Sequence, residues 1–248
     1  MVISLPQLPT WPSYTLIRNA MISQTPMRRL FTKLIAGAPN RRTRFHDATG
    51  TRVPLSRLVR NGSRGLGGAI LRVLLGYRPQ VPWISYDAQA RLARHLTPSS
   101  RVLEFGSGMS TLWFAARAGE VVSVEHHPEW YAKIKGMLPQ SPAVDYRLAA
   151  DAATYCEIAD EAGFDLVMVD GRFRDQCVAA GLKVLLPGGI LYLDNSDHAL
   201  DDYDGDVPRA VTLIEDAARQ TGWQLERFTD FAPTMFFVQA GLLLQREQ

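Results

Sequence analysis

An apolar strand that runs directly into a glycine turn constrains this chain most. Val102 begins the apolar stretch, Gly106 and Gly108 form the turn, and Ser110 and Thr111 follow at the start of an expected helix. Glycine lets the backbone turn sharply and approach a ligand, and the amides at a helix start attract polar or anionic groups. This pattern predicts a strand, turn and helix that bind a nucleotide-type ligand.

A second apolar segment strengthens that expectation. Residues 120–125 resemble a buried strand, and Glu125 ends it 19 residues after Gly106. Doubly wound folds place an acidic residue about 20 positions after the glycine turn, where its carboxylate accepts the hydroxyls of a ribose. A third glycine is missing, because Met109 to Thr111 continue the run. This disfavours a pyrophosphate ligand.

The rest of the second half alternates between expected strands and helices. We expect strands near 101–106, 120–125, 143–148, 164–170 and 188–194, and helices near 83–96, 109–118, 128–138, 152–160, 174–185 and 208–220. Such alternation predicts a parallel sheet of the α/β class. Residues 223–229 and 235–244 resemble two further strands with only 230–233 between them, and this short connection predicts an antiparallel pair.

Four segments together resemble class I S-adenosylmethionine-dependent methyltransferases. They are the Glu104–Gly108 turn, the strand ending in Glu125, the 164–170 strand, and the Leu-Pro-Gly-Gly sequence at 186–189 before the 190–194 strand. The resemblance covers roughly residues 83 to 245. It implies a Rossmann-like, doubly wound, seven-stranded and mostly parallel sheet of order 3-2-1-4-5-7-6 with an antiparallel final hairpin. It also implies methyl transfer from S-adenosylmethionine.

The cofactor site that follows from the resemblance lies at the carboxyl ends of the strands. Asp151 stands after the third strand, where it can accept from an adenine amino group or simply cap a helix, and both interpretations stay open. In the family the leading helix lies over the cofactor, which places Trp83 and Ser85 at the border of the site, while a simple core role for Trp83 stays open. The expected cofactor-binding residues are Glu104, Phe105, Gly106, Ser107, Gly108, Ser110, Thr111, Glu125, His126, Asp151, Ala152 and Asp170.

The resemblance also suggests residues for catalysis. Asp170, Asp194 and Asn195 match the ligands of magnesium-dependent catechol-type O-methyltransferases, and three oxygen ligands suit Mg²⁺. Arg172 and Arg174 stand where those enzymes place a catalytic lysine, which leaves a metal-free site open. In that case Arg172 would orient an anionic substrate, and His198 would be the general base. The candidate catalytic residues are therefore Asp170, Arg172 and His198.

The charge distribution divides the chain. Residues 1–99 hold 15 of the 27 Lys and Arg residues but only two of the 25 acidic residues. Two prolines near residue 80 support a basic N-terminal helical extension over residues 1–80, as a cap or association segment, before a methyltransferase domain over 81–248. Within the extension, 27–35 alternates cationic and apolar residues, 60–68 is interpreted as a flexible connection, and 69–77 as a helix.

These observations favour an enzyme that methylates a hydroxyl of a small molecule. Methylation of RNA or another macromolecule stays open, as does a catalytically silent module that keeps the fold. A solvated face explains the N-terminal arginines, while contact with an anionic membrane or nucleic acid, and a homodimer, are further alternatives. The two cysteines fit a reducing compartment, so we expect a cytoplasmic protein, with a peripheral position on a membrane left open.

Overall fold

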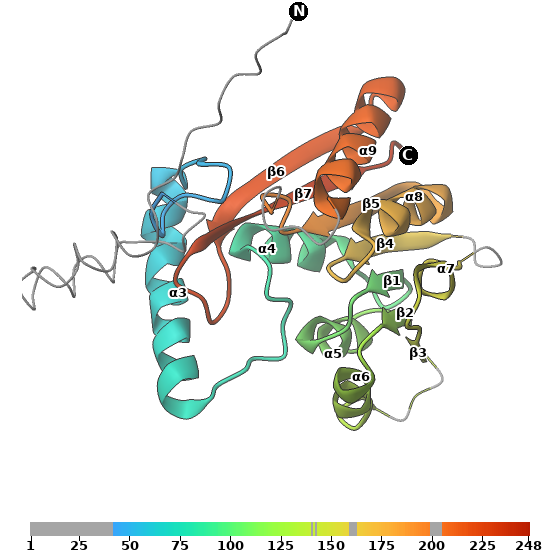
Figure 1. Ribbon diagram of the computed structural model, residues 1–248, viewed down its shortest axis with the longest axis horizontal. Coiled ribbons are helices and arrows are strands. Elements are labelled where there is room, and N and C mark those ends of the chain that lie inside the picture. Colours follow the sequence, from blue (N-terminus) through green and yellow to red (C-terminus); the bar gives the residue numbers. More distant parts are fainter. Residues whose placement is uncertain (1–41, 140, 142, 159–162, 199–204) are drawn as a thin grey trace, which may run out of the picture. The chain divides into compact units, whose positions relative to one another are not determined.

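Seven strands form one mixed sheet in the order β3-β2-β1-β4-β5-β7-β6 (Figure 1). The computed structural model describes residues 42–139, 141, 143–158, 163–198 and 205–248. The strands are β1 (Arg101–Phe105), β2 (Glu120–Glu125), β3 (Val144–Leu148), β4 (Phe164–Val169), β5 (Leu185–Asp194), β6 (Gln224–Phe231) and β7 (Val238–Gln245). β7 runs antiparallel to both of its neighbours, β5 and β6, and the other strand pairs described in this sheet are parallel. The expected strand order and closing hairpin are confirmed.

Helices cover both faces of the sheet. α8 (Arg174–Val184) and α9 (Asp206–Thr221) pack on one face, and α4 (Tyr86–His95) and α5 (Met109–Ala115) pack on the other. Neighbouring residues of β1 divide between the faces, since Val102 belongs to one buried cluster and Leu103 to the other. The sheet is therefore buried on both sides, which explains why its central strands are continuous apolar runs.

Helix ends follow local signals. The Ser85 hydroxyl accepts from the Ala88 amide at 3.2 Å and caps α4. α6 (Pro128–Lys135) stops before the expected end near 138, where Pro139 disfavours a helical residue in front of it. α7 (Ala152–Tyr155) is a single turn, so the expectation of a helix over 152–160 was too long.

The largest correction concerns residues 60–68. They do not form a flexible connection but lie within the single helix α3 (Leu55–Leu75). A Cβ on Gly65 would lie 3.0 Å from the Met235 carbonyl oxygen and 3.2 Å from the Phe231 Cβ, and one on Gly68 would lie 3.0 Å from the Thr234 nitrogen. These glycines allow close approach to the β6–β7 connection, and this packing outweighs their low helix propensity.

Polar contacts hold α3 in place. The Asn61 amide donates to Asp230 on β6 at 2.6 Å, and the Arg57 guanidinium pairs with Asp87 of α4 at 2.7 Å. Before the helix, Val53 packs with Phe231 and Val238. The described residues of the expected extension thus contact the sheet, while a domain boundary near residue 80 stays a prediction.

Some expectations fall on residues without a described structure. The stretch at 27–35, which alternates cationic and apolar residues, lies outside the described residues. Of the helices that are described, none has the length and hydropathy needed to cross a bilayer.

Candidate functional site

The glycine turn brings the ends of β1 and β4 into contact. Gly106 has a φ of 98°, and a Cβ there would lie 2.5 Å from the Gly171 nitrogen. The Asp170 amide donates to the Phe105 carbonyl at 2.9 Å, which continues the pairing of the two strands up to the turn. Only glycine fits at position 106, because a side chain would collide with backbone atoms and would require a left-handed conformation.

A buried carboxylate lies beneath this turn. Glu104 Oε2 accepts from the hydroxyls of Thr111 and Ser123, both at 2.6 Å. The other oxygen, Oε1, is buried without a hydrogen-bond partner among the described residues. Burial raises the pKa of Glu104 to about 7, although the nearby hydroxyls of Ser110, Ser123 and Thr111 oppose the shift. The turn is therefore built over an acid that is only partly satisfied.

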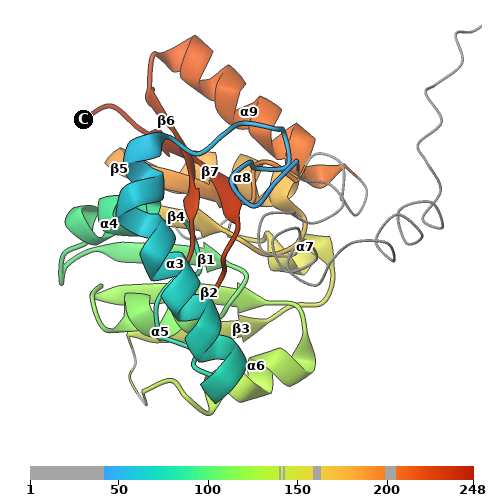
Figure 2. The same ribbon diagram turned by 90° about the vertical axis from the view of Figure 1, so that its left-hand side faces the viewer.

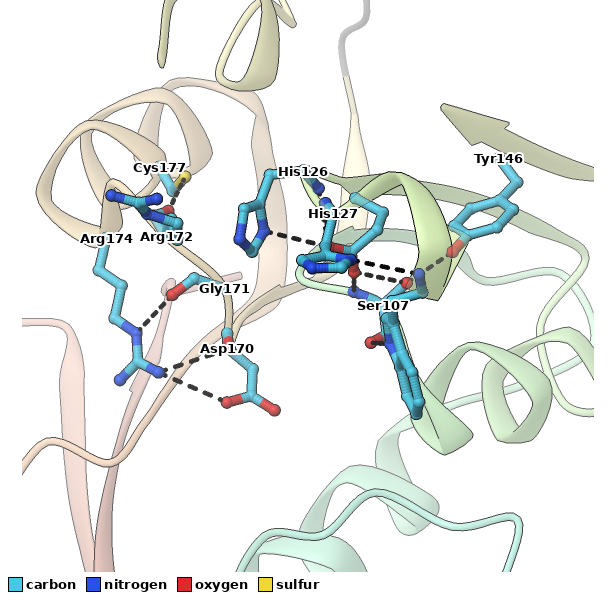
Figure 3. A network of polar contacts seen from close by, with 11 residues as sticks. Ser107, His126, His127, Tyr146, Asp170, Gly171, Arg172, Arg174 and Cys177 are labelled. Carbon is cyan, nitrogen blue, oxygen red and sulfur yellow. Dashed lines mark hydrogen bonds and ion pairs between the residues drawn. The ribbon is translucent and has the colours of Figure 1, made fainter. Parts of the chain in front are cut away.

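Glu125 joins the end of β2 to the same turn. Its Oε2 accepts from the Ser107 amide at 3.2 Å and hydroxyl at 2.8 Å, and its Oε1 accepts from the amides of His126 and His127, both at 2.8 Å. The Tyr146 hydroxyl lies 2.6 Å from Ser107 Oγ (Figure 3). Four donors thus fix this carboxylate at the edge of the sheet.

Two adjoining cavities open along this edge. The larger has a volume of about 430 Å³ and the smaller about 140 Å³, and both are lined by Ser107, Trp130 and Asp170. The larger cavity is also lined by Gly106, Glu125, His126, His127 and Gly171. The smaller cavity is also lined by Arg78, Val81, Trp83, Gly108, Met109 and Ser110. The Trp130 indole donates to the Ser107 carbonyl at 2.9 Å, which fixes its ring beside the turn where both cavities meet it.

Sequence reasoning missed Trp130, His127 and Arg78. Trp130 and His127 follow Glu125 closely, and that proximity was the available signal. Arg78 precedes the glycine turn by almost 30 residues, and no local pattern connects it with the site. Its guanidinium lies 5.9 Å from the centre of the Trp83 ring, which also lines the smaller cavity.

The acids that end β4 and β5 surround an arginine. The Arg174 guanidinium donates to the carbonyls of Gly171 and Asp194 at 2.9 and 2.8 Å and to Asn195 Oδ1 at 3.3 Å. It also lies 3.6 Å from Asp170 Oδ1 (Figure 3). Among the described residues, no three His, Cys, Asp or Glu side chains cluster as metal ligands. The structure brings Asp170, Asp194 and Asn195 together, but it places a guanidinium among them.

Asp170 and Asp194 influence each other's protonation. Burial raises the pKa of both, that of Asp194 well above its usual range, and Arg174 opposes the shift in each case. The Asp170 side chain is 33% exposed and lines both cavities, whereas Asp194 is buried. Two adjacent carboxylates that resist ionisation together favour a state in which the pair holds one proton.

The other predicted site residues have different surroundings. The Phe105 side chain packs in the core, and Thr111 supports Glu104. Asp151 caps α7 by accepting from the Thr154 amide at 3.0 Å, directly before Ala152. Arg172 and His198 lie near this edge of the sheet but do not line either cavity.

His126 lies beside the larger cavity. Its Nδ1 is 3.0 Å from Glu125 Oε1. Burial lowers the pKa of His126, and the positive charge of Arg172 lowers it further, while Glu125 opposes the shift. We therefore describe this contact as one between a carboxylate and a neutral imidazole.

Comparison with known proteins extends this picture. No protein-family model and no curated protein matches the sequence. Solved structures do match. The O-methyltransferase from Bacillus cereus in complex with SAH is 16% identical over 75% of this chain and 99% of that chain, with a TM-score of 0.55. The O-methyltransferase TomG from Streptomyces achromogenes, involved in tomaymycin synthesis and in complex with SAM, is 21% identical over 74% of this chain and 80% of that chain, with a TM-score of 0.51.

An rRNA methylase from Streptococcus thermophilus is also similar, at 15% identity over 69% of this chain and 98% of that chain, with a TM-score of 0.50. These neighbours differ in what their names say they act on, and identities this low establish the fold rather than the substrate. The chain has the fold of class I S-adenosylmethionine-dependent methyltransferases.

The buried acid makes stability depend on pH. The unfolded chain ionises Glu104 near its ordinary pKa of 4.5 and the folded chain only near 7. The stabilisation that comes from the protonated acid is therefore present at low pH and is lost as pH rises through 7. Glutamine does not titrate. Between about pH 6 and about pH 8.5 we therefore expect the unfolding free energy of the native protein to fall by about 1.4 kcal/mol relative to that of Glu104→Gln.

Chemical denaturation at the two pH values measures this change. Glu120→Gln is the matched control, because Arg101 lowers the pKa of Glu120 and its ionisation is complete across this range. A stability difference for Glu104→Gln that does not vary with pH would show that Glu104 is ionised in the folded protein throughout.

Proposed function

We propose that this chain transfers a methyl group from S-adenosylmethionine to a hydroxyl of a small molecule. The observation that carries the proposal is the unpartnered, buried Oε1 of Glu104 beneath the glycine turn. S-adenosylmethionine carries a sulfonium and an ammonium group, and a carboxylate in a low-dielectric position attracts such cations strongly. Glu104 lines neither cavity, but the glycine turn above it lines both, so its negative charge fits a cation held against the turn. S-adenosylmethionine supplies an electrophilic methyl group when bound.

The larger cavity suits the nucleoside part of the cofactor. Glu125 lies in its wall, and a ribose hydroxyl can replace the Ser107 hydroxyl as a donor to Oε2, since Ser107 Oγ also has Tyr146 within 2.6 Å. The rings of His126, His127 and Trp130 offer flat surfaces to a base. Contact of Asp151 with the adenine amino group remains part of the proposal.

The smaller cavity suits the acceptor. Val81, Trp83, Met109 and Trp130 give it apolar and aromatic walls, and Arg78 adds one positive charge. A volume of about 140 Å³ fits a single ring better than a polymer chain. These properties support a small, planar acceptor with a polar or anionic substituent near Arg78.

Asp170 is our candidate for the general base. A hydroxyl must lose its proton as it attacks the methyl group, and Asp170 is the carboxylate that borders both cavities. Burial keeps its pKa raised, so it binds a proton more readily than an exposed aspartate, and Arg174 holds its charge in place. Protonated Asp194 would stabilise that charge from the buried side. Arg172 and His198 stay predictions as substrate-orienting and basic residues.

The residues at the ends of β4 and β5 do not fit a divalent cation. Arg174 binds Asn195 Oδ1 and approaches Asp170 Oδ1, which are two of the oxygens that a metal would need. Its side chain is 11% exposed, and it also donates to the carbonyls of Gly171 and Asp194. A fixed guanidinium supplies the positive charge there, so we propose a reaction that needs no Mg²⁺.

Asp170→Asn tests the role of the base. We expect turnover to fall about 10²- to 10⁴-fold while cofactor affinity changes little, because the amide keeps the shape but accepts no proton at neutral pH. Release of S-adenosylhomocysteine from a panel of hydroxylated aromatic acceptors measures turnover, and calorimetry measures affinity. Asp175→Asn is the control, since Asp175 pairs with Arg209 and lines neither cavity. Unchanged turnover would remove Asp170 from catalysis, and a native protein that does not bind S-adenosylmethionine would support a silent module.

Metal removal tests whether the Arg174 guanidinium takes the place of a divalent cation. We expect dialysis against EDTA to leave turnover of the native protein within about twofold of its original value, because Arg174 already provides the charge between the strand ends. Turnover is measured before dialysis, after it, and after addition of Mg²⁺. A loss that Mg²⁺ restores would contradict the metal-free proposal and return Asp170, Asp194 and Asn195 to the role of ligands.

A further inference from the structure

Apolar side chains gather on the exposed surface of α3. Nine of the twelve large apolar side chains that the described residues expose lie between residues 55 and 77. Val59, Val73 and Leu75 are 74%, 83% and 75% exposed. A contiguous exposed apolar patch of this kind marks a surface that binds something apolar, whereas scattered exposed residues need no explanation.

Helix geometry separates this patch from the buried side of α3. Gly62 and Gly65 face Phe231 on the sheet. At about 100° per residue, most of the exposed apolar positions fall within about 100° of one another, in an arc whose middle lies about 120° from the middle of the arc formed by the buried Asn61, Gly62 and Gly65. We call Leu55, Val59, Leu66, Ile70, Val73 and Leu74 the α3 ridge. Figure 2 views the molecule from the side on which α3 lies.

The charges around the α3 ridge have one sign. Between residues 48 and 86 the sequence holds six arginines and no lysine, aspartate or glutamate. A symmetric contact between two copies of α3 would bring arginines to face arginines, which is unfavourable. An occupant with an apolar interior and an anionic surface complements both features.

Arginines also line a cavity beside the ridge. The space between α3, α4 and β6 measures about 420 Å³ and is lined by Arg57, Arg60, Arg64, Arg91 and Arg94. Asp87 and Glu226 are the acids in its wall, and they pair with Arg57 and Arg91 at 2.7 and 3.1 Å. Arg94 has no ion pair with a described residue. The cavity therefore carries an excess of positive charge that suits phosphate groups.

We propose that the α3 ridge docks on an anionic lipid bilayer, with the arginines beside it contacting headgroup phosphates. The apolar side chains enter the boundary between headgroups and acyl chains, and the helix lies along the surface. Long arginine side chains reach the phosphates while their stems remain near apolar surface. Coulombic attraction to the anionic leaflet adds to apolar burial, so binding requires both parts of the surface.

Sedimentation with lipid vesicles tests this proposal on the full chain. We expect binding to vesicles that contain phosphatidylglycerol, with at least about tenfold weaker partitioning to pure phosphatidylcholine and at high salt. Val73→Ser/Leu74→Ser should weaken binding at least about tenfold, because both side chains leave the bilayer boundary. Arg94→Ala, which breaks no ion pair with a described residue, should weaken it less.

Leu213→Ser is the matched control, since Leu213 is an exposed apolar residue of α9, outside the ridge. Equal melting temperatures of the variants and the native protein show that they fold. Absence of vesicle binding by the native protein would overturn the proposal. So would salt-sensitive RNA binding without vesicle binding, or a dimer in lipid-free solution that Val73→Ser/Leu74→Ser dissociates, since either result would assign the surface to another occupant.

Discussion

The buried carboxylate of Glu104 is the contact on which the geometry of the glycine turn depends. Its Oε2 joins Thr111 of α5 to Ser123 of β2, while Glu104 itself belongs to β1. One acid therefore connects the two strands and the helix that surround the proposed cofactor site. Its Oε1 has no partner among the described residues, and burial raises its pKa to about 7. Burying an acid with an unpartnered oxygen is unfavourable, and a cation bound beside Glu104 would reduce that unfavourable energy.

At the ends of β4 and β5, a positive charge compensates two neighbouring carboxyl groups. Two carboxylates lie close together there, and the Arg174 guanidinium prevents them from being two uncompensated negative charges. Phe173 and Asn195 have φ angles of 53° and 50°, in the left-handed region that non-glycine residues seldom occupy. Strained backbone on both sides of Arg174 supports a functional role for this arrangement, and only Asp170 extends from it into the cavities.

Most of the sheet could be predicted because its central strands are continuous apolar runs that end in polar residues. The glycine turn and Glu125 could be placed for the same reason, since the carboxyl ends of neighbouring parallel strands meet. Tertiary contacts explain what was missed. Glycines in the sequence of α3 indicate a flexible segment, but in the fold they allow close packing of the helix against Phe231 and Thr234. Spacing along the chain also predicts neither Arg78 in the smaller cavity nor the position of Arg174 among the acids.

Proton release on cofactor binding is the most direct test of whether Glu104 contacts the cation of S-adenosylmethionine. If that cation binds beside Glu104, the pKa of Glu104 must fall from about 7, and the carboxyl group must lose the proton that it partly holds at neutral pH. Calorimetry near pH 7 in buffers of different ionisation enthalpy counts that proton. With a cation beside Glu104, the native protein should release about half a proton more than Glu104→Gln. Equal proton counts for the two proteins, or no binding by the native protein, would contradict it.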